Sequence, residues 1–239
     1  MGHIYTTGDT HGDFRRFSFR NFKRGKELTK KDFMIINGDF GGIWYFKDHH
    51  KHPGEIRQLE WLNNKPWTTL FVDGNHENFT LLKEFPEVPF HGGVAGKISD
   101  SIYHLKRGEI YTLNGLKFFC IGGASSIDKL QRVDGVSWWP EELLSYAEEA
   151  NISKNLDRCQ NTVDYIITHT APTSIIKERL LPYIKMITGN DYYMEDPVSR
   201  VLDQVYKTVD FKRWFCGHMH CDIEFDDITF TYNKIHKIK

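Results

Sequence analysis

The sequence has few cysteines, no long apolar run and no excess of charge of either sign. Its 239 residues include four cysteines without CxxC spacing, which favours reduced thiols in a cytoplasmic protein over a disulfide framework. No run approaches the roughly 18 apolar residues of a membrane span and no signal region opens the chain, so we expect no membrane partner. Lys and Arg (31) balance Asp and Glu (32), giving a formal net charge of −1. This balance argues against a generic nucleic-acid surface and leaves room for a small phosphorylated substrate.

What the sequence does contain is short apolar runs separated by helical stretches. Apolar residues make up 40% of the chain and aromatic residues 14%, which is enough for a sizeable core. Early runs such as "DFMIING" (32–38) are almost continuously apolar, which is typical of strands covered on both faces. Asn114-Gly115 lies between two alternating runs and predicts a hairpin. The pattern therefore predicts a layered α/β domain with two sheets and helices outside them.

Three stretches are expected to be helical: 55–64, 140–156 and 197–207. The second and third open on Pro140 and Pro197, and proline suits the first helical turn. No internal repeat, low-complexity tract or linker appears, so we predict a single domain over residues 1–239. Two stretches, near 125–142 and 173–197, are interpreted as insertions that lie over a site.

Polar side chains of only three types, Asp, Asn and His, follow five of the predicted strands. In chain order they are Asp9, His11, Asp39, Asn75, His76, His169, His218 and His220. Residues two apart at a strand end project to the same side, and sites in open α/β sheets form outside the carboxyl ends of strands. Imidazoles together with carboxylates and an amide oxygen suit divalent Mn, Fe, Zn or Co ions. A set of about seven such ligands fits two ions bridged by one carboxylate better than one tetrahedral ion.

Taken in order, these motifs resemble those of the calcineurin-like metallophosphoesterase superfamily. They stand as "DTH" (9–11), "GDFG" (38–41), "GNHE" (74–77), a lone histidine (169) and "GHMH" (217–220). The resemblance implies a four-layer αββα sandwich of two mixed sheets flanked by helices. It also implies two divalent metal ions, with Mn²⁺ favoured over Fe²⁺, Zn²⁺, Co²⁺ or Ni²⁺.

The resemblance also assigns roles to the residues at the strand ends. One metal ion would be bound by Asp9, His11, Asp39 and His220. The second would be bound by Asp39, Asn75, His169 and His218, with Asp39 as the bridge. The catalytic residues would be His76 and Asp39, with His76 contacting phosphate and protonating the leaving oxygen. The expected substrate contacts are Asn75, His76, Arg16 and Ser126.

The expected activity is hydrolysis of a phosphomonoester or phosphodiester, on a small or nucleotide-like substrate, by metal-bound hydroxide. A nuclease or a protein phosphatase on the same fold is the alternative. The subgroup of the superfamily that dephosphorylates Ser/Thr proteins carries an Asp and an Arg where this chain has Gly42 and Ile43, and this departure argues against protein phosphatase activity of that type. A non-catalytic scaffold is disfavoured because no ligand position is missing. Arg132 and Lys129 are further cations near the motif loops, and a solvated surface charge is the favoured interpretation of both.

Overall fold

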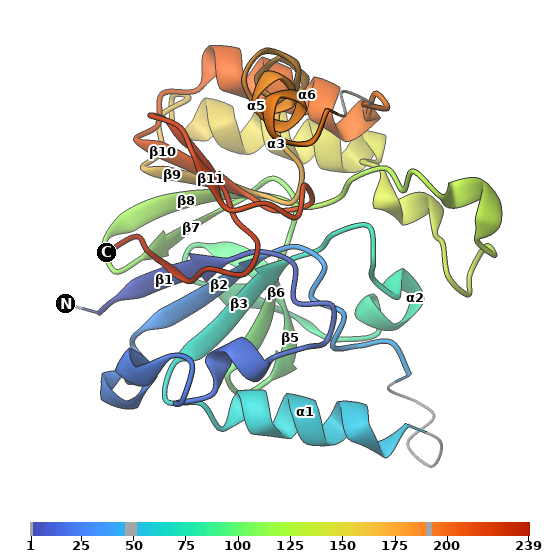
Figure 1. Cartoon of the computed structure of the whole chain (residues 1–239). Coiled ribbons are helices and arrows are strands. Elements are labelled where there is room, and N and C mark those ends of the chain that lie inside the picture. The colour runs from blue at the N-terminus through green and yellow to red at the C-terminus, as the bar shows by residue number, and fades with distance from the viewer. Residues whose placement is uncertain (1, 46–51, 190–192) are drawn as a thin grey trace.

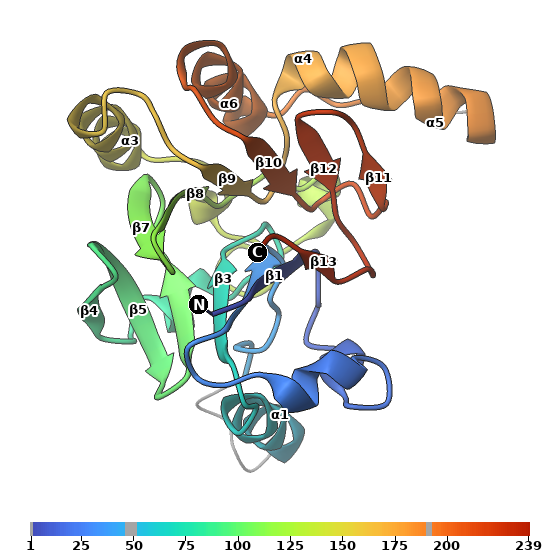
Figure 2. The same cartoon turned by 90° about the vertical axis from the view of Figure 1, so that its left-hand side faces the viewer.

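The computed structural model describes residues 2–45, 52–189 and 193–239. Within these ranges the chain forms two β-sheets packed face to face, with helices on both outer faces (Figures 1 and 2). This is the α/β sandwich of two mixed sheets that the sequence predicted. None of the helices in the described ranges is both long and apolar enough to cross a membrane.

In spatial order, the described strands of the first sheet are β13 (His236–Lys237), β1 (Ile4–Thr7), β2 (Phe33–Asn37), β3 (Thr68–Val72), β6 (Ile102–Leu105), β5 (Gly93–Ser99) and β4 (Glu87–Phe90). The central strands β1, β2, β3 and β6 run parallel to one another. The outer strands β13, β5 and β4 pair antiparallel with their neighbours. The sheet is therefore mixed, with its parallel part formed by the early apolar runs.

In spatial order, the described strands of the second sheet are β11 (Ile223–Glu224), β12 (Ile228–Phe230), β10 (Arg213–Cys216), β9 (Tyr165–Thr168), β8 (Leu116–Ile121) and β7 (Glu109–Leu113). Its central strands β12, β10, β9 and β8 are parallel. β7 and β8 form an antiparallel hairpin. Asn114 and Gly115 both have positive φ at its turn, 49° and 83°, so the hairpin predicted from this dipeptide is confirmed.

The described α-helices are α1 (Pro53–Asn63), α2 (Phe79–Leu82), α3 (Tyr146–Arg158), α4 (Thr173–Ile175), α5 (Leu181–Thr188) and α6 (Pro197–Thr208). Shorter helical turns are η1 (Arg15–Phe17), η2 (Lys23–Glu27), η3 (Lys129–Gln131), η4 (Pro140–Glu142) and the π-helical η5 (Ile176–Leu180). Figure 2 shows α1 outside the first sheet, and α3 to α6 outside the second.

Alternate side chains of each strand enter different hydrophobic clusters, as a period of two requires. In β2, Met34 and Ile36 pack toward α1, whereas Ile35 packs between the two sheets. In β10, Trp214 packs toward α3 and α6, whereas Phe215 packs between the sheets. The strands are therefore buried on both faces, which explains their nearly continuous apolar sequences.

One helix begins later than the sequence predicted. The stretch from Pro140 forms the separate turn η4, and α3 begins only at Tyr146. The side chain of Ser145 accepts a hydrogen bond from the Glu148 amide, and Glu148 accepts one from the Ser145 amide. This capping box satisfies the free amides at the start of α3 and fixes its boundary.

The carboxyl ends of the parallel strands in both sheets meet at one edge of the sandwich. β1, β2 and β3 contribute the loops after residues 7, 37 and 72, and β9 and β10 contribute those after 168 and 216. The segment 125–142, yellow-green in Figure 1, extends beyond the sheets at this edge. The fold thus gathers the strand-end residues that are far apart in the sequence.

Candidate metal centre

Four of the predicted ligands lie at backbone positions that L-residues rarely adopt. The φ angles are 46° at His11, 47° at Asp39, 64° at His218 and 47° at His220. Each such non-glycine residue costs on the order of 1–3 kcal/mol, which the surrounding packing must offset. Strain of this kind is found at functional sites because it directs side chains to a common point. Here the four side chains belong to three separate loops that face one another.

Asp9, His11, Asp39 and His220 form the tightest group of potential ligands. One ligand atom from each lies within 4.8 Å of all the others. The Nε2 atoms of His11 and His220 are 3.2 Å apart, and His11 Nε2 is 3.7 Å from Asp39 Oδ2. Both carboxylates are about 1% exposed. Buried carboxylates surrounded by imidazole nitrogens form a donor set that fits a divalent cation.

His169, Asn75 and Asp39 form an adjoining group. His169 Nε2 lies 3.0 Å from Asn75 Oδ1 and 3.3 Å from Asp39 Oδ1, and its Nδ1 is 2.9 Å from the backbone oxygen of Asn37. Donation from Nδ1–H to that oxygen leaves, in the neutral ring, a lone pair on Nε2 that faces two oxygen acceptors. A cation satisfies such a convergence of acceptors.

His218 connects the two groups. Its backbone amide donates to both carboxylate oxygens of Asp9, at 3.0 and 3.1 Å, and its ring packs against that of His169 with centroids 4.9 Å apart. Burial, together with the smaller effect of the neighbouring His169, lowers the pKa of His218 to about 3. The ring is therefore neutral at physiological pH, which is the form that binds a metal ion.

The two aspartates show that the site needs positive charge. Burial raises the pKa of Asp9 to about 7, against the opposing effect of His169. Burial also acts to raise the pKa of Asp39, but His169, His76 and His11 together hold it below its ordinary value. Two buried carboxylates this close stay ionised together only with cations beside them. The residues therefore fit a bound metal pair electrostatically as well as geometrically.

Two glycines permit the close packing of this centre. A Cβ atom on Gly38, whose φ is 89°, would overlap the His169 ring. A Cβ atom on Gly74 would overlap the Asp39 carboxylate. Both positions require glycine because the loops after β2 and β3 approach a ligand side chain directly.

His76 lies beside the ligand cluster and not within its tightest part. Its backbone amide donates to Asp39 Oδ1 at 2.8 Å. The two terminal nitrogens of Arg132 lie 3.1 and 3.2 Å from the two ring nitrogens of His76. Arg132 also donates to Asp128 Oδ1 at 2.7 Å and to the Ser137 backbone oxygen at 3.2 Å. The insertion at 125–142 thus brings a guanidinium to the edge of the centre.

The interpretation of Arg132 as a solvated surface charge is therefore wrong, since its side chain is only 13% exposed. The one weak signal for Arg132 in the sequence is its position as a cation within an insertion expected to lie over the site. Lys129, the other cation considered in this insertion, is exposed and lies over the ring of Trp138, 4.0 Å from its centroid.

Two of the expected substrate contacts, Arg16 and Ser126, are engaged with protein groups. Arg16 donates to the backbone oxygens of Gly8 and Asp9 at 2.8 and 2.9 Å, which supports the first ligand loop from behind. Ser126 is buried and its Oγ accepts a hydrogen bond from Asn75 Nδ2 at 3.0 Å. This bond turns the amide oxygen of Asn75 toward His169. Substrate contact by Arg16 and Ser126 stays a prediction.

The calcineurin-like phosphoesterase family matches residues 2–222 of the chain. The chain therefore belongs to this family, as the motifs predicted. Members of the family bind two divalent metal ions, and the donor set at the strand ends fits such a pair. The choice of Mn²⁺ stays a prediction.

Three curated relatives are all lariat debranching enzymes. That of Schizosaccharomyces pombe is 26% identical over 211 residues, covering 81% of this chain and 44% of the relative. That of Entamoeba histolytica is 23% identical over 239 residues, covering 92% and 64%. That of Drosophila melanogaster is 26% identical over 238 residues, covering 91% and 42%. The chain thus spans roughly half the length of the relatives it matches.

Proposed function

We propose that this protein hydrolyses a phosphodiester linkage in a nucleic acid, with a branched RNA as the first candidate substrate. The observation that carries the proposal is a pair of hollows that meet at His76, one toward α1 and the other toward α6. A phosphodiester carries an organic group on each side of phosphorus, whereas a monoester carries one. Space on two sides of the reacting centre therefore favours the diester.

The hollow toward α1 has a volume of about 750 Å³. His11 and His76 lie at the metal side, and Trp44, Tyr45 and Arg57 line the rest. The volume falls within the range of small-molecule sites, roughly 300–1,000 Å³. Aromatic surface next to a cation suits a nucleobase next to its phosphate.

The hollow toward α6 has a volume of about 500 Å³. It is lined by the ligands Asp39 and Asn75 and, farther out, by Arg132, Tyr193 and Met194. It repeats the combination of a cation with aromatic and apolar surface. Each side of the centre can therefore accept a nucleotide-sized group.

The relatives are lariat debranching enzymes, which supports a branched nucleic acid as the substrate of this chain. The net charge of −1 does not oppose the proposal, because a short strand at the site contacts few phosphates and needs few cations. The charge balance led us to expect a small substrate. We propose instead that the site binds one short part of a larger nucleic acid.

The chain's own residues have definable tasks in this reaction. When bound, the metal pair supplies the nucleophile near neutral pH and neutralises charge on the phosphoryl oxygens. The backbone amide of His76 donates a hydrogen bond to Asp39 Oδ1 and so holds the Asp39 carboxylate in place. The His76 ring, which borders both hollows, would give a proton to the departing oxygen. Arg132, beside that ring, is placed to bind a phosphoryl oxygen with its planar guanidinium.

A substrate panel tests the proposal. Protein loaded with Mn²⁺ is assayed on a branched RNA with a 2′–5′ linkage, a linear RNA of the same composition, bis(p-nitrophenyl) phosphate and p-nitrophenyl phosphate. We expect kcat/KM to be highest for the branched RNA and higher for the diester than for the monoester. A preference for the monoester would overturn the proposal. Asp39→Asn serves as the control for contaminating hydrolases.

A further inference from the structure

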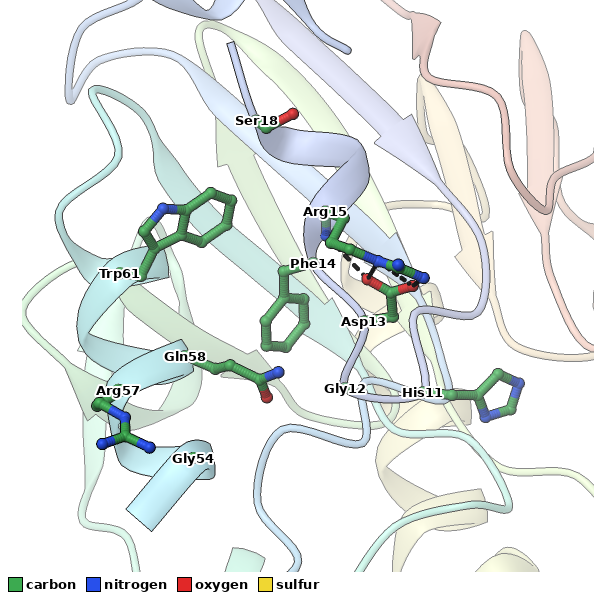
Figure 3. A pocket seen from close by; sticks show the side chains of 10 residues that line it. All are labelled: His11, Gly12, Asp13, Phe14, Arg15, Ser18, Gly54, Arg57, Gln58 and Trp61. Carbon is green, nitrogen blue, oxygen red and sulfur yellow. Dashed lines mark hydrogen bonds and ion pairs between the residues drawn. The ribbon is translucent and has the colours of Figure 1, made fainter. Parts of the chain in front are cut away.

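A third hollow, with a volume of about 690 Å³, lies between α1 and residues 11–18 (Figure 3). We call it the α1 trough. It shares His11, Gly12, Gly54 and Arg57 with the hollow that opens toward α1 from His76. The trough is therefore a continuation of the space beside the metal centre, leading away from it along the helix.

The trough is lined by one face of α1 that the core does not use. Gly54, Arg57, Gln58 and Trp61 recur at the spacing of one helical face and all border the trough (Figure 3). The core-packing residues of α1 are instead Leu59 and Leu62, which are buried. α1 thus carries an exposed face whose residues packing alone does not explain.

Aromatic surface forms the far end of the trough. Trp61 is 39% exposed although its side chain is large and apolar, and Phe14 lies opposite it from the other wall. The ammonium of Lys65 lies over one face of the Trp61 ring, 3.3 Å from its centroid, which restricts rotation of the indole and leaves the opposite face for a base. A fixed, partly exposed indole is a surface on which a planar base stacks.

Arg57 supplies an available positive charge. Its side chain is exposed, and no carboxylate among the described residues pairs with it. Arg15, the other cation of the trough, is paired with Asp13 at 2.6 Å. Arg57 lies one helical turn from Trp61 on α1.

From this arrangement we propose that the α1 trough binds a nucleotide of the substrate strand beyond the one held in the hollow toward α1. The base stacks on Trp61, and the phosphate that precedes or follows it binds Arg57. The inference rests on the proposed function, because it names where the strand leaves the metal centre. It assigns to α1 a role in strand binding that the metal-site motifs do not contain.

The first test measures binding of a fluorescein-labelled six-nucleotide RNA with phosphorothioate linkages to the Mn²⁺-loaded chain, by anisotropy. Trp61→Ala should weaken binding at least about fivefold, the low end for a base stacked on an aromatic side chain, and Trp61→Phe should restore most of it. The matched control is Tyr146→Ala, because Tyr146 is 92% exposed on α3, outside the second sheet. That control should bind as the unmodified chain does.

The second test uses the salt dependence of the same binding. Removing one phosphate contact to a single strand lowers the slope of log K against log salt by about 0.7. Arg57→Ala should show that decrease and Arg57→Lys should not. Arg200→Ala, an exposed arginine on α6, is the matched control and should keep the slope.

The outcomes separate this inference from the proposed function. If Trp61→Ala and Arg57→Ala bind the RNA as tightly as the unmodified chain, the trough does not hold the strand, whatever the chain hydrolyses. If the chain binds the RNA through both residues but hydrolyses only monoesters, the trough stands and the proposed reaction falls. Equal weakening by the controls would also overturn the trough, since it would place the strand elsewhere.

Discussion

Glu142 is expected to make the protein less stable as pH rises. The side chain is 1% exposed, and its Oε2 accepts a hydrogen bond from the Ser126 amide at 3.0 Å. Its Oε1 is buried and has no hydrogen-bond partner in the described part of the chain. Burial raises the pKa of Glu142 from 4.5 to about 7, against the opposing hydrogen bonds from Ser126.

The sign follows from proton binding. Between pH 4.5 and about 7 the folded state holds the Glu142 proton more tightly than the unfolded state does. Stability is therefore lost as pH rises through this window, and the loss persists above it. A pKa difference of about 2.5 corresponds to about 3 kcal/mol at full development. Glu142→Gln keeps the shape of the protonated acid and removes the titration.

The assay is urea-induced unfolding of metal-free protein, followed by tryptophan fluorescence at pH 5 and pH 8. Other titrating groups cancel in the difference between variant and unmodified chain. We expect the stability of Glu142→Gln relative to the unmodified chain to rise by about 2 kcal/mol between these pH values. The same difference at both would refute the reasoning. Glu141→Gln is the control from the same turn, since a hydrogen bond from Lys83 lowers the pKa of Glu141 and no such rise is expected.

Three further outcomes are expected. Asp39→Asn should bind fewer than two equivalents of Mn²⁺ by elemental analysis and lose more than about tenfold in turnover, about 1.4 kcal/mol; full metal content with normal turnover would exclude a bridging role. His76→Asn should keep both metals and lose roughly 10²–10⁴-fold on an alkyl phosphodiester but far less on a nitrophenyl one, and equal losses would remove the proton-donor role. Ser126→Ala removes the hydrogen bond that orients the Asn75 amide, at a cost of about 1 kcal/mol. Calorimetric titration should therefore show one Mn²⁺ site weakened about fivefold and the other unchanged. Unchanged affinity at both sites would contradict this role of Ser126.

The ligand set could be read from the sequence because its signal is local. An apolar strand followed by glycine and Asp, Asn or His specifies a strand end by itself, and parallel strands bring such ends to one edge. The hairpin at Asn114-Gly115 was predictable for the same reason, since positive φ is a property of those residues. The order of motifs then defined the family without any knowledge of distances.

Only the tertiary structure decided what surrounds those ligands. Arg132 and His76 are 56 positions apart, and nothing near Arg132 in the sequence distinguishes it from a solvated arginine. Trp61 occurs in a stretch that predicts an ordinary amphipathic helix, and its place in the α1 trough depends on where residues 11–18 cross that helix. Burial, hydrogen-bond partners and pKa values depend on groups that the fold brings together from distant parts of the chain. The amino-acid sequence by itself therefore identifies the metal ligands but not the residues that line the site around them.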